Sequence, residues 1–340
     1  MRGFVYGEVG LYHNGDATED VSMGANCVRI MLRTWGGSAT TGNSYSFPNV
    51  DGEASGSPGN TDPTYLAGVG EQLISAKRAG LKTILALDSN CGQNGNQDSS
   101  MTTFCTIGFS PGQNYYTTGG AAKRAEHLER VRFVTAEWLG LIDFIEFVVE
   151  PNPTTTGGGR TDINQMAHDC MVVAVGVDPL IIPILGGTAY QHGHIQDPIG
   201  TIAYPTTNLV LTCDLLDNIM SGDPVAYAAA VQQMVDARTA QNLPVICQQA
   251  GTKMSSEVGG AGSSTDSLKT ASGLALLRDP AGDGSVDSIG WTFWEKVSKG
   301  ANAYGPWYDS SSDGRNRILV SQNRVDVLTA ALAAPPIFTP

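Results

Sequence analysis

Five acidic side chains follow short apolar runs in this chain of 340 residues. Carboxyl groups that lie close together raise one another's pKa, and this is one way in which proteins produce a general acid. Carboxylate oxygens also bind hard cations such as Mg²⁺ or Ca²⁺. The pattern therefore indicates acid–base chemistry or, as the weaker alternative, a metal site. The five acids are Glu8, Asp88, Glu150, Asp214 and Glu295.

The elements that position these acids are predicted from the alternation of two patterns. Short apolar runs, typical of buried strands, alternate with amphipathic segments of helical length. The predicted strands cover residues 3–6, 27–32, 82–87, 144–149, 180–185, 209–213, 244–247 and 288–294. The predicted helices cover residues 16–23, 63–79, 121–139, 162–175, 223–241, 265–277 and 325–333. Pro63 is expected to open the second helix and Gly80 to cap it.

Eight strands joined by helices predict a single (β/α)₈ TIM barrel over residues 1–340, with its core at about 3–335. No linker divides the chain into two predicted domains. In such barrels the loops that follow the strands build the active site. Two long polar loops, 34–62 and 88–120, follow predicted strands here. We therefore expect a cleft at the carboxyl ends of the strands that accommodates an extended ligand.

Composition excludes several classes of partner. The formal net charge of −13 repels phosphate backbones and anionic membrane surfaces, so we expect no nucleic-acid or membrane partner. A neutral polymer is compatible with this charge. No apolar run approaches the ~20 residues of a membrane span, and no signal peptide is visible. The sequence also contains no cofactor motif.

The cysteines and histidines give no strong indication of a metal site. There is no Cys-x-x-Cys motif, and His192 and His194 have no further ligands at zinc spacing. Three cysteines lie in apolar runs and are expected to be buried thiols: Cys27, Cys213 and Cys247. Cys91 and Cys105 flank a polar loop, and whether they form a disulfide is left open.

Several segments, taken in order, resemble clan-A glycoside hydrolases, and most closely family 5, the cellulase and mannanase family. Residues 24–30, GANCVRI, are similar to a strand motif of that family. Residues 76–85, AKRAGLKTIL, are similar to its next helix and strand, and 289–294, IGWTFW, to its last strand. Residues 244–251, PVICQQAG, resemble its nucleophile strand and 147–151, FVVEP, its acid strand. The resemblance implies a TIM barrel that acts on β-linked polysaccharides.

The resemblance implies roles for four residues. Glu150 matches the acid/base, Trp294 the tryptophan on which sugars stack, and Arg29 an arginine that orients the nucleophile. Gln249 stands where the family has its nucleophilic glutamate. Hydrolysis with retention needs two carboxyl groups, and an amide cannot replace the attacking one. Gln249 is then either an amide that hydrogen-bonds Arg29 or a residue that contacts the ligand. For Arg29 the alternative is a structural role as the partner of a carboxylate.

Other positions also depart from the family pattern. The asparagine expected before the acid is Val149, and the histidine that ends the third strand is Asp88. The His-x-Tyr motif of the sixth strand is replaced by Asp214, Leu215 and Leu216. These replacements indicate a natural lineage whose site has been rebuilt or lost. In a rebuilt site, Glu8, Asp88, Asp214 or Glu295 supplies the second carboxylate, and a spacing of ~6.5–9.5 Å from the acid suits inversion.

Aromatic residues in predicted loops and at strand ends are candidates for stacking on sugar rings, with packing as the alternative. Trp138 and Trp291 are expected to pack in the core. The candidates for substrate binding are Trp35, Tyr190, Trp294 and Trp307, with Tyr12 as a further exposed aromatic.

The sequence therefore predicts a glycoside-hydrolase-like barrel that acts on or binds a β-linked polysaccharide. In this hypothesis Glu150 is the acid/base and Gln249 occupies the nucleophile position. The alternative is a glycan-binding or structural barrel without activity, such as a virion or adhesion component. The location is open, with an extracellular or virion-associated protein as the expectation.

Overall fold

The structure is a computed structural model. It describes residues 1–6, 16–33, 63–88, 121–147, 160–186, 204–205, 207–215, 224–251, 265–294, 296–298, 306–309, 317–319 and 321–338.

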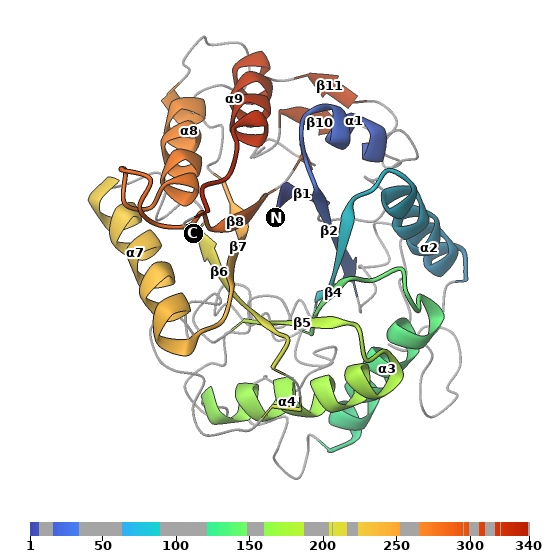
Figure 1. Cartoon of the computed structure of the whole chain (residues 1–340). Helices are drawn as coiled ribbons and strands as arrows, with labels where there is room; N and C mark the ends of the chain where they lie inside the picture. The colour runs from blue at the N-terminus through green and yellow to red at the C-terminus, as the bar shows by residue number, and fades with distance from the viewer. Residues whose placement is uncertain are drawn as a thin grey trace, which may run out of the picture. The chain divides into compact units, whose positions relative to one another are not determined.

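Eight strands close into a barrel in the order of the chain, from β1 to β8 (Figure 1). β1 closes the ring because it pairs in parallel with both β2 and β8. The predicted (β/α)₈ fold is therefore confirmed. The strands are β1 (Arg2–Tyr6), β2 (Cys27–Arg33), β3 (Lys82–Asp88), β4 (Phe144–Glu146), β5 (Ile182–Leu185), β6 (Val210–Leu215), β7 (Val245–Ala250) and β8 (Gly290–Phe293).

Seven helices in the described part of the chain match the seven predicted ones. Gly80 has a φ of 83°, a backbone conformation that glycine adopts without strain, so the predicted end of α2 is confirmed. None of the described helices is long and apolar enough to span a membrane. The helices are α1 (Asp16–Ser22), α2 (Pro63–Arg78), α3 (Ala121–Glu137), α4 (Arg160–Val177), α7 (Pro224–Gln241), α8 (Thr265–Arg278) and α9 (Gln322–Ala333).

Some predicted boundaries were wrong for local reasons. The last helix begins at Gln322, three residues before the predicted start, because Ser321 caps it and accepts a hydrogen bond from the Arg324 amide at 3.1 Å. β5 begins two residues late because Leu180 lies in a turn, where its amide donates to Asp178 Oδ1 at 3.0 Å. Hydrophobic periodicity does not reveal either side-chain contact.

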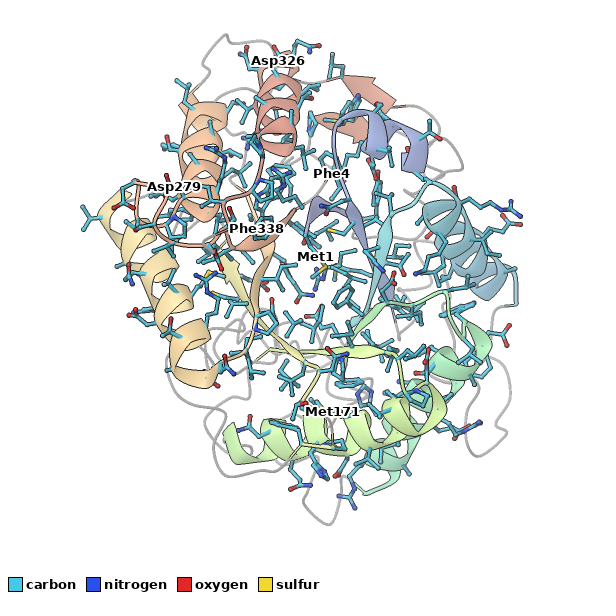
Figure 2. All side chains as sticks on the ribbon, in the orientation of Figure 1. Met1, Phe4, Met171, Asp279, Asp326 and Phe338 are labelled. Atoms are coloured by element: carbon cyan, nitrogen blue, oxygen red, sulfur yellow. The ribbon has the colours of Figure 1, made fainter. Side chains whose placement is uncertain are left out.

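The chain divides into two compact units. The first comprises Met1–Ile30, Ile74–Thr83 and Thr212–Pro340. In this unit Arg2 donates to the carbonyl of Ala331 at 3.1 Å and so ties β1 to α9. The guanidinium of Arg324 lies 5.6 Å from the ring centroid of Phe293, which joins α9 to β8. Phe4 of β1 is fully buried in the core of this unit (Figure 2).

The second unit comprises Met31–Leu73 and Ile84–Leu211. Its β4 pairs with β3 and β5, and α3 and α4 pack against each other. Met171 of α4 is fully buried (Figure 2). Burial, and then the neighbouring Arg130, lower the pKa of His127 on α3 to about 3, so its imidazole is neutral at physiological pH. The prediction of one domain across both units stays a prediction.

A second, three-stranded sheet was not predicted from the sequence. It consists of β9 (Val297–Ser298), β10 (Trp307–Asp309) and β11 (Arg317–Leu319), with β10 in the middle. β10 pairs in parallel with β9 and antiparallel with β11. Strands of two or three residues are too short to show a period in sequence.

The predictions for buried thiols and packed tryptophans are confirmed. Cys27, Cys213 and Cys247 are buried thiols, and the thiol of Cys170, which was not predicted, is buried as well. Trp138 and Trp291 are buried. Cys91 and Cys105 lie outside the described residues.

Candidate functional site

The inside of the barrel can be identified from the residues that contact helices. The pKa of Tyr227 on α7 is raised, first by burial and then by the nearby thiols of Cys247 and Cys213, so both thiols face the helix layer. Phe293 also faces that layer, because it contacts Arg324 of α9. Side chains alternate along a strand. Thr212 and Asp214, which flank Cys213 on β6, therefore face the inside of the barrel.

A β-bulge in β7 turns two glutamines toward this inside face. Cys247 pairs with Trp291 and Ala250 pairs with Phe293, so the two residues Gln248 and Gln249 oppose the single residue Thr292. The hydroxyl of Thr292 donates to the Gln248 carbonyl and fixes this irregular register. Bulges of this kind are common next to active sites because they redirect a side chain.

The predicted site residues of the first unit are buried on this inside face. Arg29 pairs in register with Val5. Tyr6, next to Val5, donates to Asp20 of α1 and so faces the helices, which means that Val5 and Arg29 point inward. It is fully buried, Asp214 is 3% exposed and Gln249 is 2% exposed. β6, which carries Asp214, is the neighbour of β7 in the barrel. The charge of Asp214 adds to the effect of burial in raising the pKa of Cys247 on β7. β2, β6 and β7 thus supply a cation, an acid and an amide to one surface.

The end of β7 and the glycine that follows it lie against the backbone of the predicted platform tryptophan. The amide of Trp294 donates to the Ala250 carbonyl at 2.9 Å. A Cβ at Gly251 would lie only 2.8 Å from the carbonyl oxygen of Trp294, so only glycine allows this approach. Trp294 is partly exposed, as a stacking surface requires.

Trp307 was predicted to bind substrate, and the structure places its ring near the ammonium of Lys296. The ammonium of Lys296 lies 5.3 Å from the Trp307 ring centroid and 5.2 Å from that of Phe4. One face of the indole therefore packs on a cation. Trp307 is partly exposed and pairs in register with Val297 on β9.

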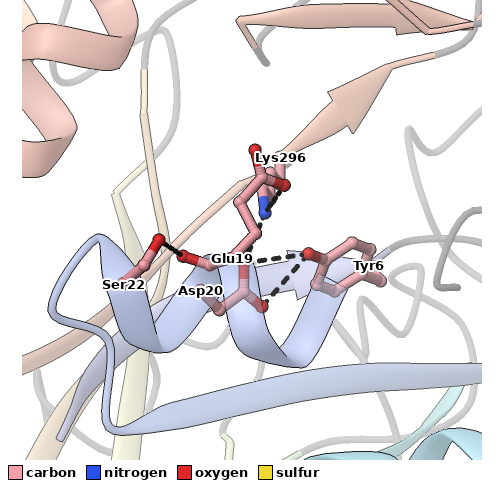
Figure 3. Close-up of polar contacts among 5 residues, drawn as sticks. All are labelled: Tyr6, Glu19, Asp20, Ser22 and Lys296. Atoms are coloured by element: carbon pink, nitrogen blue, oxygen red, sulfur yellow. Dashed lines mark hydrogen bonds and ion pairs between the residues drawn. The ribbon is translucent and has the colours of Figure 1, made fainter. Parts of the chain in front are cut away.

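Lys296 belongs to a buried charge cluster that sequence analysis missed (Figure 3). Its Nζ lies 2.6 Å from Glu19 Oε2 and 2.6 Å from Asp20 Oδ1. Tyr6 donates to Asp20, with both carboxylate oxygens at 3.1 Å. Lys296, Asp20 and Tyr6 are almost entirely buried. The cluster ties α1 and the end of β1 to the segment that follows Trp294.

Burial raises the pKa of Asp20 to about 6, although the ammonium of Lys296 acts in the opposite direction. The nearby Asp16 adds to the rise, and the Tyr6 hydroxyl opposes it. Lys296 and Asp20 are 276 residues apart in sequence, so no local motif predicts their contact.

Sequence analysis also missed Gln248, Thr212 and Glu146. All three are fully buried. An acidic residue inside the apolar run 144–149 was a signal for Glu146. Gln248 stands next to Gln249 in the sequence, but neighbouring residues of a regular strand point to opposite faces, so sequence alone does not bring the two side chains together.

Several predicted site residues fall outside the described part of the chain. The roles predicted for these residues from the sequence stay predictions. They are Glu8, Glu150, Glu295, Trp35 and Tyr190, together with the further aromatic candidate Tyr12. His192 and His194, for which no metal site was predicted, also lie outside the described residues. The backbone of Asp88 ends β3, but its side chain is not described. Among the side chains that are described, no three histidine, cysteine or acidic residues converge as a metal site.

Comparison with known proteins identifies the fold. No family model and no curated protein matches the chain. Thermotoga maritima Cel5A, solved with cellobiose, has a TM-score of 0.64 and 13% identity, over 96% of each chain. A triple mutant of an endo-β-1,4-glucanase from Xanthomonas axonopodis pv. citri has a TM-score of 0.64 and 13% identity, over 97% of this chain and 98% of that one. The chain has the fold of these cellulases. At this identity the likeness concerns the fold alone.

Proposed function

We propose that this protein is a glycoside-hydrolase-like barrel that binds and acts on a β-linked polysaccharide. The observation that carries the proposal is the inward-facing set of Arg29, Asp214 and Gln249 on strands β2, β6 and β7 of a closed barrel. These are three of the strands on which the resemblance to family 5 predicts site residues. The cellulases with the same fold bind cello-oligosaccharides such as cellobiose, which supports a β-linked glycan as the ligand.

In this proposal Glu150 is the acid that protonates the glycosidic oxygen. Gln249 cannot replace the attacking carboxylate, because its amide is neutral and the nitrogen electron pair is delocalised into the carbonyl, so ordinary double displacement is absent. Asp214 is the best candidate for the second carboxylate, since its side chain faces the inside of β6 beside β7. As a general base it would activate water on the opposite face of the sugar, which gives inversion.

A second candidate is a barrel that binds glycans without cleaving them. The observation that favours it is the amide at position 249, buried where the resemblance places a nucleophile. In that case the partly exposed Trp294 contributes to affinity, and neither Glu150 nor Asp214 takes part in a reaction.

The test is incubation of the purified protein with β-glucans, mannans, xylans and amino-sugar polymers, followed by mass spectrometry of released oligosaccharides. We expect products from the wild type and a loss of about 10²–10⁴-fold in Glu150→Gln and in Asp214→Asn. Products that persist unchanged in Asp214→Asn would remove Asp214 from the mechanism.

Gln249→Glu separates the two candidates. If the site has lost only its nucleophile, restoring the glutamate creates hydrolysis with retention of the anomeric configuration, which NMR of fresh products detects. Binding of a polymer without cleavage by any variant would establish the binding barrel. Neither binding nor cleavage of any polymer would overturn the proposed function.

A further inference from the structure

Three buried side chains on the inside faces of β6 and β7 have polar atoms for which the described residues provide no hydrogen-bond partner. They are both amide atoms of Gln248, Nε2 of Gln249 and the hydroxyl oxygen of Thr212. Gln248 and Thr212 are fully buried, and Gln249 is 2% exposed. Buried polar groups in native proteins are nearly always paired, and exceptions call for an explanation such as a bound ligand.

The β-bulge explains why two of these side chains lie together. In a regular strand Gln248 and Gln249 would point to opposite faces. Here both glutamines oppose the single inward-facing residue Thr292. On either side of them, Cys247 and Ala250 pair with residues of β8 that face the helices. The regular pairing of β7 with β8 is thus interrupted where the two glutamine side chains reach the inside of the barrel.

The chemistry of these atoms describes their ligand. The two Nε2 groups are donors, Gln248 Oε1 is an acceptor, and the Thr212 hydroxyl can be either. None of these groups carries a charge, so they favour a neutral partner. A ligand that satisfies them must both accept and donate hydrogen bonds, and it must reach more than one side chain.

A secondary amide meets this requirement. Its carbonyl and its N–H lie on opposite sides of one planar group, so they reach two different side chains. A sugar hydroxyl also accepts and donates, but from a single oxygen, so it spans a shorter distance between two side chains than an amide does. We infer that Gln248 and Gln249 bind the acetamido group of an N-acetylated sugar unit, with a glutamine Nε2 donating to its carbonyl and Gln248 Oε1 accepting from its N–H. This inference rests on the proposed function and specifies its substrate class.

The test compares two neutral tetrasaccharides that differ at C2. β-1,4-linked N-acetylglucosamine tetramer and cellotetraose are titrated into the full chain by calorimetry. We expect at least tenfold tighter binding of the acetylated tetramer, because a site built to hydrogen-bond a group rejects the analogue that lacks it. Equal affinity, or a preference for cellotetraose, would overturn the inference and leave the proposed function standing.

Gln248→Met keeps the length of the side chain and removes its hydrogen-bonding groups. We expect the preference for the acetylated tetramer to fall at least tenfold, while affinity for cellotetraose stays within twofold and the melting temperature does not fall. Gln232→Met, on the exposed pair of Gln232 with Asp236 on α7, is the matched control and should change neither affinity. An unchanged preference in Gln248→Met would contradict the inference.

The result also distinguishes this inference from the proposed function. If neither tetramer binds and no polymer is cleaved, the proposed function itself has failed. If cellotetraose binds and is cleaved while the acetylated tetramer is ignored, only the acetamido site has failed.

Discussion

Lys296 and Asp20 are as buried as the amides of β7, but the two sets of polar groups are satisfied in different ways. The ammonium of Lys296 has two carboxylates at 2.6 Å and two aromatic rings near it. Gln248 is just as buried, and within the described part of the chain its amide has no partner. A buried polar group that is paired within its own chain stabilises the fold. A buried polar group without a partner lowers stability but is available to bind a ligand. The predictions below test this difference.

The largest effect is expected from Lys296→Met. It leaves Asp20 and Glu19 without their cation, and breaking a buried pair costs about 3–5 kcal/mol in free energy of unfolding. Urea denaturation measures this. Arg132→Met, which breaks the exposed pair with Glu129 on α3, is the control and should have a far smaller effect. Similar losses in both variants would show that the cluster is not a structural anchor.

The next effect is a pH dependence that arises from Asp20. The pKa of its carboxyl group is about 6 in the folded chain and 3.8 ordinarily, so the folded state binds the proton more tightly. Its contribution to stability is complete below about pH 4 and is lost as the pH rises through 6, on the order of 3 kcal/mol in total.

Comparison with Asp20→Asn isolates this contribution. The comparison is needed because the lowered pKa of His127 acts in the opposite direction, and stability from that residue is lost as the pH falls below 6.5. Urea denaturation of both proteins from pH 4 to pH 7 should show the wild type losing stability relative to the variant. A constant difference would contradict the raised pKa.

Tyr6→Phe is expected to have a smaller effect. It removes the hydrogen bond to Asp20, and hydrogen bonds to charged groups contribute about 1.5–3 kcal/mol. Tyr227→Phe is a matched control, because that buried hydroxyl donates to a neutral carbonyl, of Gly273, at 3.0 Å. Thermal denaturation at pH 7.5 should show the larger loss for Tyr6→Phe, and the reverse order would weaken the role given to the Asp20 charge.

The smallest effect, of opposite sign, is expected for Gln248→Met. Replacing an unpaired buried amide by an apolar side chain of similar length should leave the free energy of unfolding unchanged or raise it by about 1 kcal/mol. Chemical denaturation without ligand measures this. A loss above about 2 kcal/mol would mean that the amide is satisfied within the folded chain and is no open site.

The order of the barrel strands was predictable because each strand is a local apolar run, and the helices between them are amphipathic segments that sequence also reveals. The β-bulge in β7 was not, because it depends on the pairing of Cys247 and Ala250 with β8. The inward positions of Arg29 and Asp214 follow from alternation along their strands, and the place of Gln249 at the site follows from the resemblance. The Lys296 cluster joins residues from opposite ends of the chain, and only the closed fold brings them together.

The most direct test of this account is a crystal structure of the protein with bound N-acetylglucosamine tetramer. We predict an acetamido group within 3.2 Å of an amide atom of Gln248 and of Gln249, on the inside of β7. A tetramer bound elsewhere, with both glutamines hydrogen-bonded to other groups of the chain, would contradict the account.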